Sequence, residues 1–367
     1  MEIEIIRDTG QLEAFCEHAG TRDWLAVDTE FMREDTYYPK LCLVQIATGR
    51  RIACIDTLTI DDLSALNKLL NSKTSTKVFH AARQDLEVLY MLSSEVPAPV
   101  FDTQVAASAL GYGDQVSYAH LVNTLCGVCL DKSLSRTSWT QRPLPDQAIR
   151  YAANDVRYLS QIYICLKEEL AGRGRTHWVE SECQHLCHAD QYRIDLDNSW
   201  KSIKSARRLK PKQLVVLKRL ASWRDRLAME RNRPRQWIMR DETLYELAVK
   251  QPASIPSLTN IDSLTRKQRN RLADALLDCI SKARQTPEQD WPLSIQKPAL
   301  TREQRKTLKR AKQFIQERAE QLHVTPNFLA SRSMLENLVC DPEGSQALQG
   351  WRQNLIGNDL EQLLGEE

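Results

Sequence analysis

Residues 24–31 form an apolar run that carries two carboxylates at alternate positions, Asp28 and Glu30. An apolar run of this length predicts a buried strand, on which residues two apart face the same side. The strand therefore presents both carboxylates together. Like charges at close range are costly inside a protein unless a counter-charge is present. Hard divalent cations with oxygen ligands supply that charge, so the pattern predicts a metal-dependent site.

Two further segments carry side chains of the same kind. Tyr151 and Asp155 are four residues apart on a predicted helix and therefore share one of its faces. Asp85 follows a predicted short strand and falls in the first turns of an amphipathic helix, where the helix dipole favours an anion. Asp102 also precedes a predicted helix, but we interpret it as the N-cap of that helix rather than as a ligand.

The first 170 residues have the pattern of an α/β domain. Strands are predicted at 24–31, 41–48, 51–57, 77–80 and 99–102, and helices near 11–19, 61–71, 83–92, 103–110, 117–126 and 145–170. The first three strands have short connections, as an antiparallel meander requires. The later strands alternate with helices, as parallel crossovers require. We therefore expect a mixed sheet flanked by helices.

The carboxylates and the tyrosine, in their order and local context, resemble the three exonuclease motifs of the DEDD superfamily in its tyrosine-containing branch. Four further segments are similar to the ribonuclease D family in particular: Phe-Asp-Thr-Gln at 101–104, Leu-Asp-Lys-Ser at 130–133, Ser-Trp at 138–139 and Arg-Pro-Leu at 142–144. The resemblance implies a ribonuclease H-like fold over residues 1–172. It also implies a 3′→5′ exoribonuclease that uses two divalent cations, Mg²⁺ or Mn²⁺.

The same resemblance implies a role for each acidic residue. Asp28 would bridge both cations, Glu30 and Asp155 would complete the first, and Asp85 would hold the second through water. Tyr151 would orient the attacking water; its ordinary pKa near 10 favours orientation over full general-base action. The implied product is a 5′-mononucleotide, released from the 3′ end of structured RNA such as a transfer RNA precursor.

Charge is distributed unevenly along the chain. Residues 1–200 carry 19 Lys and Arg against 28 Asp and Glu, a balance of −9, and residues 201–367 carry 31 against 20, a balance of +11. Such a basic half favours contact with a polyanion. Candidate nucleic-acid contacts there are Arg207, Arg208, Lys210, Lys212, Lys218 and Arg219. Nearer the acidic motifs, the candidates are His80, Gln84, Lys132, Arg136 and Arg142.

Beyond residue 172 the sequence is helical in pattern. We expect a helical connector at 173–209, a helical domain at 210–290, a linker at 291–300 and a second helical domain at 301–367. The first of these domains resembles the HRDC domain, chiefly at Trp223-Arg224 and in the pattern from Asp241 to Ala248. The second resembles a divergent copy, because Thr325-Pro326 and the residues that follow repeat part of the first.

Composition excludes several other classes of protein. No apolar stretch approaches the roughly 18 residues that span a bilayer, and no signal peptide precedes the first strand. We therefore expect a soluble, cytoplasmic protein, and nothing indicates an obligate protein partner. The ten cysteines are scattered, which favours reduced thiols. We interpret the clusters at 126–129 and 183–188 as ordinary helix or loop residues rather than metal sites.

Three alternatives stay open at the level of sequence. A 3′→5′ DNA exonuclease would use the same residues, since none of them distinguishes a 2′-hydroxyl from a 2′-hydrogen. A non-catalytic RNA-binding scaffold on the same fold would be favoured if a carboxylate were missing, and all four are present. A metal-independent hydrolase would need a Ser-His-Asp or Cys-His arrangement that the sequence does not indicate.

Overall fold

The chain divides into two compact units in a computed structural model, which describes residues 2–130, 137–294, 300–342 and 344–365. Unit 1 consists of residues 1–32, 40–192 and 300–367, and unit 2 of residues 33–39 and 193–299. Residues 300–367 thus group with the predicted catalytic domain. The interpretation of residues 301–367 as a second HRDC-like domain stays a prediction.

Unit 1 holds the sheet. Its strands are β1 (Glu2–Ile6), β2 (Trp24–Met32), β3 (Lys40–Ala47), β4 (Arg51–Ile55), β5 (Thr76–Phe79) and β6 (Val100–Asp102). Its first helices are α1 (Thr9–Ala19), α2 (Ser64–Leu70), α3 (Arg83–Ser93), α4 (Thr103–Leu110), α5 (Tyr118–Cys126), α6 (Asp146–Gly172) and α7 (Thr176–Leu186). A short 3₁₀ turn, η1 (Ala189–Gln191), follows.

The six strands lie in the order β1-β4-β3-β2-β5-β6. β2, β3 and β4 pair antiparallel, whereas β5 pairs parallel to β2, β6 to β5 and β1 to β4. The expected fold class, a mixed sheet flanked by helices, is confirmed. Strand β1 was not predicted, because five residues with two glutamates carry too weak an apolar signal without the partner strand β4.

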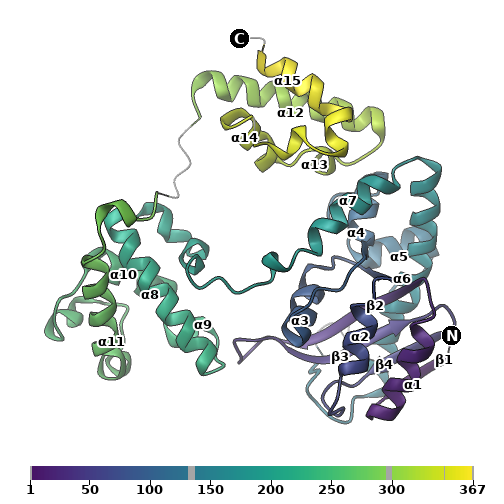
Figure 1. The fold of residues 1–367 in the computed structure, drawn as a ribbon, viewed down its shortest axis with the longest axis horizontal. Coiled ribbons are helices and arrows are strands. Elements are labelled where there is room, and N and C mark those ends of the chain that lie inside the picture. The colour runs from purple at the N-terminus through teal and green to yellow at the C-terminus, as the bar shows by residue number, and fades with distance from the viewer. Residues whose placement is uncertain (1, 131–136, 295–299, 343, 366–367) are drawn as a thin grey trace. The chain divides into compact units, whose positions relative to one another are not determined.

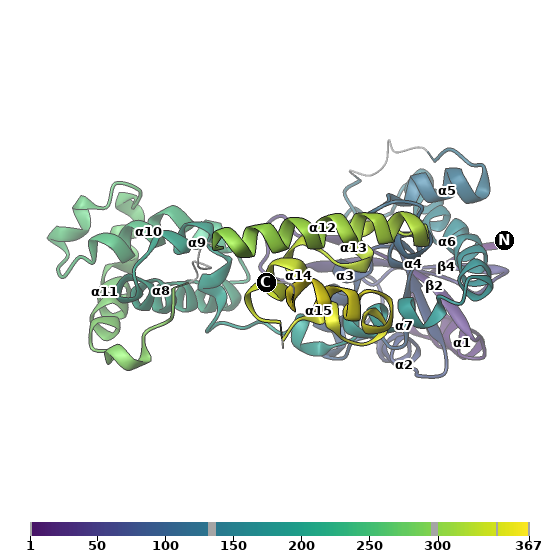
Figure 2. The same ribbon diagram turned by 90° about the horizontal axis from the view of Figure 1, so that it is seen from above.

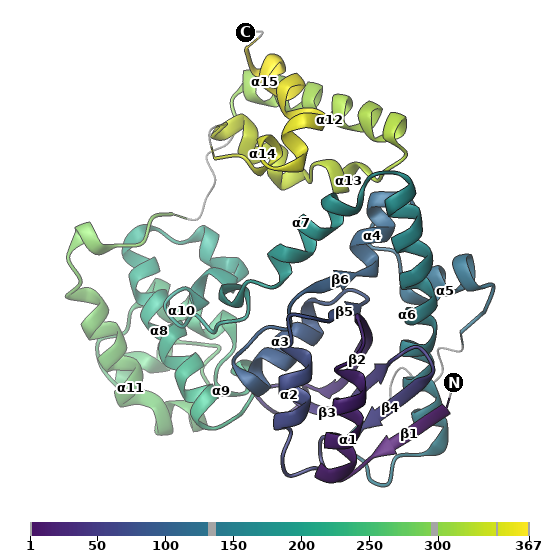
Figure 3. The same cartoon turned by 45° about the vertical axis from the view of Figure 1, so that its right-hand side comes forward.

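The two faces of the sheet build separate cores (Figures 1 and 3). On β2, Leu25 and Val27 join the core under α1, α2 and α3, while Ala26 joins the core under α4 to α7. This alternation follows from the two-residue period of a strand. Asp28 and Glu30 continue the series of Ala26 and so face α6.

The C-terminal helices of unit 1 are α12 (Arg302–Leu322), α13 (Pro326–Leu329), α14 (Arg332–Cys340) and α15 (Asn358–Gly365), with a 3₁₀ turn η6 (Gln346–Leu348) and a π-helical segment η7 (Gln353–Gly357) (Figure 2). They pack on α7 through aromatic rings. The Trp351 ring stacks on Trp178 and on Phe328, with centroids 5.1 and 5.0 Å apart. Beside the rings, Glu182 accepts hydrogen bonds from Trp351 Nε1 (3.0 Å) and Arg352 (2.6 Å).

Unit 2 is helical in the part of it that the structure describes. Its elements are η2 (Ser199–Ser202), η3 (Lys204–Arg208), α8 (Pro211–Glu230), α9 (Arg235–Ile238), α10 (Asp241–Lys250), η4 (Pro256–Asn260), α11 (Arg266–Arg284) and η5 (Glu288–Asp290). These surround one apolar core. None of the described helices in either unit is both long and apolar enough to cross a membrane.

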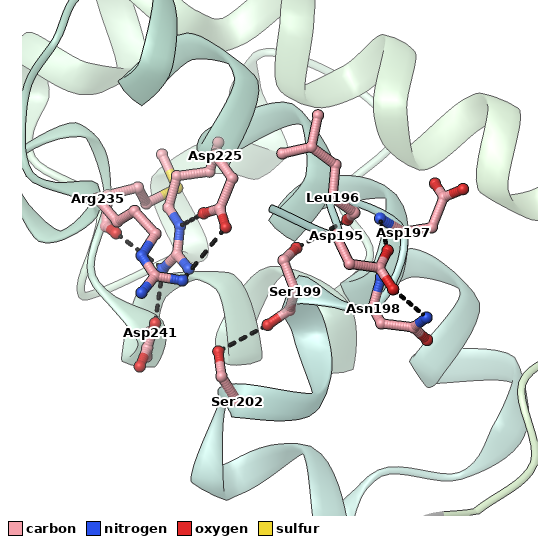
Figure 4. Close-up of polar contacts among 11 residues, drawn as sticks. Asp195, Leu196, Asp197, Asn198, Ser199, Ser202, Asp225, Arg235 and Asp241 are labelled. Atoms are coloured by element: carbon pink, nitrogen blue, oxygen red, sulfur yellow. Dashed lines mark hydrogen bonds and ion pairs between the residues drawn. The ribbon is translucent and has the colours of Figure 1, made fainter. Parts of the chain in front are cut away.

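An ionic network in unit 2 includes Asp225, Arg235 and Asp241 (Figure 4). The Arg224 guanidinium donates to Asp225 (3.1 Å), to Asp241 (2.6 Å) and to the Met239 carbonyl oxygen (3.3 Å). Arg235 adds a contact to Asp225 at 3.4 Å. A buried charge needs such partners, so the network links α8, α9 and the start of α10.

Candidate active site

Three carboxylates converge between the sheet and α6. One oxygen from each of Asp28, Glu30 and Asp155 lies within 4.8 Å of the other two. β2 supplies the first two and α6 the third. Among the residues described, no other group of three or more His, Cys, Asp and Glu side chains gathers closely enough to hold a metal ion.

The fourth acid, Asp85, reaches the same region from the first turn of α3. Its side chain is 8% exposed, and the Thr29 hydroxyl donates a hydrogen bond of 2.6 Å to its Oδ1. Thr29 was not singled out from the sequence, although its place between Asp28 and Glu30 was a signal. Thr29, which lies between Asp28 and Glu30 on β2, thus forms a hydrogen bond with Asp85, the acid that α3 supplies.

Burial and mutual repulsion make these carboxyls reluctant to ionise. Burial, followed by the charge of Asp155, raises the pKa of Asp28 to about 8. Burial and the neighbouring carboxylates raise the pKa of Glu30 to about 9, and burial raises that of Asp155 to about 7. The pKa of Asp85 is raised as well, first by burial and then by Asp28. A cation would reverse these shifts.

Tyr151 lies one turn before Asp155 on α6 and is half-buried. Trp139 is buried, with its ring centroid 6.3 Å from that of Tyr151. Burial, and then the charges of Asp155, Glu30 and Asp28, raise the pKa of the Tyr151 hydroxyl. The phenol therefore stays protonated at neutral pH and can donate a hydrogen bond.

A second tyrosine, Tyr118 on α5, lies near the same site. Its hydroxyl donates to the backbone oxygens of Asn154 (3.2 Å) and Asp155, which ties α5 to the turn of α6 that carries the carboxylate. Its ring centroid is 5.6 Å from that of His80. No spacing or charge pattern marked Tyr118 in the sequence, because it reads as an ordinary apolar position of a helix.

The predicted substrate contacts near the acids have different surroundings. Gln84 is exposed at the start of α3. His80 is half-buried, and its Nδ1 lies 3.0 Å from the Thr103 hydroxyl. Burial lowers the pKa of His80, so its ring is neutral at neutral pH. Lys132 and Arg136 lie outside the described residues.

The Arg142 guanidinium forms its hydrogen bonds within the protein. Its guanidinium donates twice to Asp56, at 2.6 Å each, and to the backbone oxygens of Cys42, Trp139 and Gln141. These contacts use all five of its N–H groups. These acceptors were not expected from the sequence, and the phosphate contact of Arg142 stays a prediction.

Five of the six basic candidates of unit 2 are exposed, and the sixth, Lys218, is half-buried. Arg207 and Arg208 end η3, Lys210 caps α8, and Lys212 lies in its first turn. The backbone N–H of Lys210 donates to Gln213 Oε1 at 3.0 Å, which leaves its ammonium group out of the cap. RNA contact by these residues stays a prediction.

A mixed ribonuclease H-like sheet with four converging acids and a tyrosine defines a DEDD-type 3′→5′ exonuclease. The family model described as "3′-5′ exonuclease" matches residues 3–171, and the one described as "HRDC domain" matches residues 213–280. The chain belongs to the ribonuclease D family, whose members are 3′→5′ exoribonucleases.

Relatives match along nearly the whole chain. Ribonuclease D of Acidiphilium cryptum is 38% identical over 98% of this chain and 93% of its own length. Ribonuclease D of Pseudomonas paraeruginosa is 36% identical over 98% of this chain and 96% of its own length. The crystal structure of Escherichia coli RNase D, described as an exoribonuclease involved in structured RNA processing, superposes with a TM-score of 0.91. It is 33% identical and covers 100% of this chain and 99% of its own.

Proposed function

We propose that the four acids hold two divalent cations, Mg²⁺ or Mn²⁺, and that the protein trims the 3′ ends of structured RNA such as transfer RNA precursors. Asp28, Glu30 and Asp155 would hold the first cation, with Asp28 shared by both. Asp85 would hold the second. Bound there, the cations would lower the pKa of the attacking water and stabilise charge on the leaving oxygen.

The observation that supports this proposal is the charge balance of the site. Among the described residues, none of the four carboxylates has an ion-pair partner, although all four side chains are at least partly buried. Buried acids without a cation are costly, and their raised pKa values express that cost. Oxygen ligands of this kind, grouped within 4.8 Å, suit Mg²⁺ or Mn²⁺ better than softer metals.

The remaining residues have roles that follow from their positions. The protonated Tyr151 hydroxyl would orient the water that attacks the terminal phosphodiester, which releases a 5′-mononucleotide. His80 and Gln84 would line the path of the 3′ end. The basic residues of unit 2 would attract the body of the RNA through its phosphates, an interaction that weakens as salt rises.

The test is a time course of cleavage on a 5′-labelled transfer RNA precursor with a 3′ extension, in Mg²⁺ or in EDTA. We expect a ladder that shortens one nucleotide at a time, and no products in EDTA. Asp28→Asn and Asp155→Asn should lower the rate by about 10³-fold, since metal stabilisation of the transition state is worth several kcal/mol. The matched control is Asp146→Asn, an exposed acid in the first turn of the same helix, which should leave the rate unchanged.

Internal fragments, or cleavage that persists in EDTA, would contradict the proposal. A DNA strand of the same sequence, run in parallel, measures the preference for ribose. Equal rates on both strands would mean that the enzyme acts on nucleic acid in general and does not prefer RNA.

A further inference from the structure

The turn between β5 and α3 has an unusual backbone. Ala81 adopts φ = 56°, in the left-handed region that residues other than glycine, asparagine and aspartate seldom enter. The turn leads into α3, whose N-cap Ala82 offers no side-chain cap. A conformation of this kind persists only where its surroundings hold it.

Asp102, at the end of the neighbouring strand β6, holds this turn. Its Oδ1 accepts the backbone N–H of Ala81 (3.0 Å), and its Oδ2 accepts that of Ala82 (2.9 Å). The same Oδ1 accepts the N–H of Gln104 (2.8 Å), which makes Asp102 the N-cap of α4 as well. Asp102 is 4% exposed, and its contact with Ala82 is buried, whereas those with Ala81 and Gln104 are partly buried.

The next residue, Thr103, contacts the two residues that precede the turn, Phe79 and His80. Its buried hydroxyl donates to the Phe79 carbonyl oxygen (3.1 Å) and lies 3.0 Å from His80 Nδ1. Because β5 and β6 are paired in parallel, with Phe79 opposite Asp102, the ends of the two strands meet here (Figure 3). Residues 102 and 103 therefore fix four consecutive residues, 79–82, at the start of α3.

Asp85 depends on this turn for its position. It lies three residues after Ala82, in the first turn of α3, and its carboxylate is held from the other side by Thr29 at 2.6 Å. A change in the backbone at Ala81 would rotate the start of α3 and move the Asp85 carboxylate away from Asp28 and Thr29. We infer that Asp102 is a positioning residue for the metal site, acting through Ala81 and Asp85. This inference rests on the proposed role of Asp85 as a ligand.

The test is Mn²⁺ binding to the full-length protein by titration calorimetry, beside Michaelis–Menten kinetics. In Asp102→Asn an amide N–H₂ faces the N–H of Ala82, so one of the two turn contacts becomes a repulsion. Substitutions behind a metal ligand typically weaken metal binding about 10- to 100-fold, and we expect a loss in that range with KM for RNA unchanged. Asp85→Asn, titrated in parallel, shows what loss of the ligand itself does.

Asp8→Asn is the matched control, because Asp8 caps α1 by accepting the N–H of Gln11 (2.9 Å) and touches neither turn nor site. Ala81→Gly added to Asp102→Asn is the rescue variant, since glycine adopts positive φ without steric cost. We expect the double variant to recover most of the lost Mn²⁺ affinity. If Asp102→Asn does not fold, Thr103→Val carries the same test, with a loss in the same direction.

The outcomes separate the inference from the proposed function. If Asp85→Asn weakens Mn²⁺ binding but Asp102→Asn matches the wild type, the inference is overturned and the ligand set stands. If Asp102→Asn weakens binding and glycine at position 81 restores nothing, the inference is overturned too, because the effect does not pass through the turn. If Asp85→Asn itself changes nothing, the proposed ligand set fails.

Discussion

At the scale of single residues, the site is defined by acids that have no ion-pair partner among the described residues. Asp28, Glu30 and Asp155 come from two elements and share one small volume, with raised pKa values. Each pKa lies above its ordinary value near 4, so the metal-free folded protein binds more protons than the unfolded chain between about pH 4 and 9. Its stability therefore falls as pH rises through that window. A bound cation displaces these protons and opposes the fall.

We accordingly expect the stabilisation by Mg²⁺ to grow with pH. The rise in Tm on adding a fixed excess of Mg²⁺ should be larger at pH 8.5 than at pH 6.5, measured by calorimetry. For each proton that the cation displaces, the stabilisation by Mg²⁺ grows by about 1.4 kcal/mol per pH unit. That corresponds to roughly 3 °C in Tm for a domain of this size. Asp28→Asn should make the rise smaller and less dependent on pH. An increment that is equal at both pH values would contradict the raised pKa values.

At the scale of elements, Arg352 joins α7 to the C-terminal helices. Its guanidinium donates to Glu182 (2.6 Å) and to the carbonyl oxygens of Leu329 (2.8 Å) and Phe328 (3.0 Å), and the side chain is buried. Arg352→Met would remove the cationic partner of Glu182, which would keep only the Trp351 Nε1 donor, and would take the Arg352 donor from two carbonyl oxygens. We expect it to lower the free energy of unfolding by about 3–5 kcal/mol in urea denaturation.

The same substitution at Arg332 is the matched control. Arg332 pairs with Glu336 at 2.7 Å on the surface of α14, and its side chain is 78% exposed. Arg332→Met should cost less than about 0.5 kcal/mol. Similar losses in the two variants would mean that the contacts of Arg352 do not contribute to the stability of unit 1.

The elements also show where sequence reasoning stops. The strand with Asp28 and the helix with Tyr151 and Asp155 were predictable, because apolar periodicity and spacing are local properties. The N-cap role of Asp102 was predictable for the same reason, and the structure confirms it. Its contacts to Ala81 and Ala82, the packing of Trp351 on Trp178 and the engagement of Arg142 by Asp56 were not. Each joins residues more than 15 positions apart, and neither partner carries a local sign of the other.

At the scale of the whole molecule, the predicted RNA contacts include basic residues of unit 2. The basic residues of unit 2 are expected to contact RNA phosphates, and each lost contact lowers the dependence of log affinity on log salt by about 0.9. We expect Lys210→Ala with Lys212→Ala to weaken binding of a transfer RNA precursor and to reduce that slope by up to about 2. Cleavage of a short unstructured RNA should keep its rate. Binding as a function of salt, by fluorescence anisotropy, measures both effects.

A second double variant, with the same change of net charge, tests whether the position of the removed cations matters. Lys267→Ala with Arg271→Ala removes two exposed cations from α11 in the same unit. We expect little change in the slope for this pair. Equal reductions in both variants would indicate general attraction to a basic surface, with no local contact at the start of α8.

Unit 1 is built from segments that lie far apart in the sequence, and this has a consequence for the synthesis of the protein. Its C-terminal helices are synthesised after the contiguous residues 193–299 of unit 2, which takes a ribosome on the order of ten seconds. During that interval Trp178 has emerged without Trp351 and Phe328 to cover it. An incomplete chain therefore displays an apolar ring that a finished one hides. Premature termination in this region yields a product that chaperones and proteases can recognise by that ring.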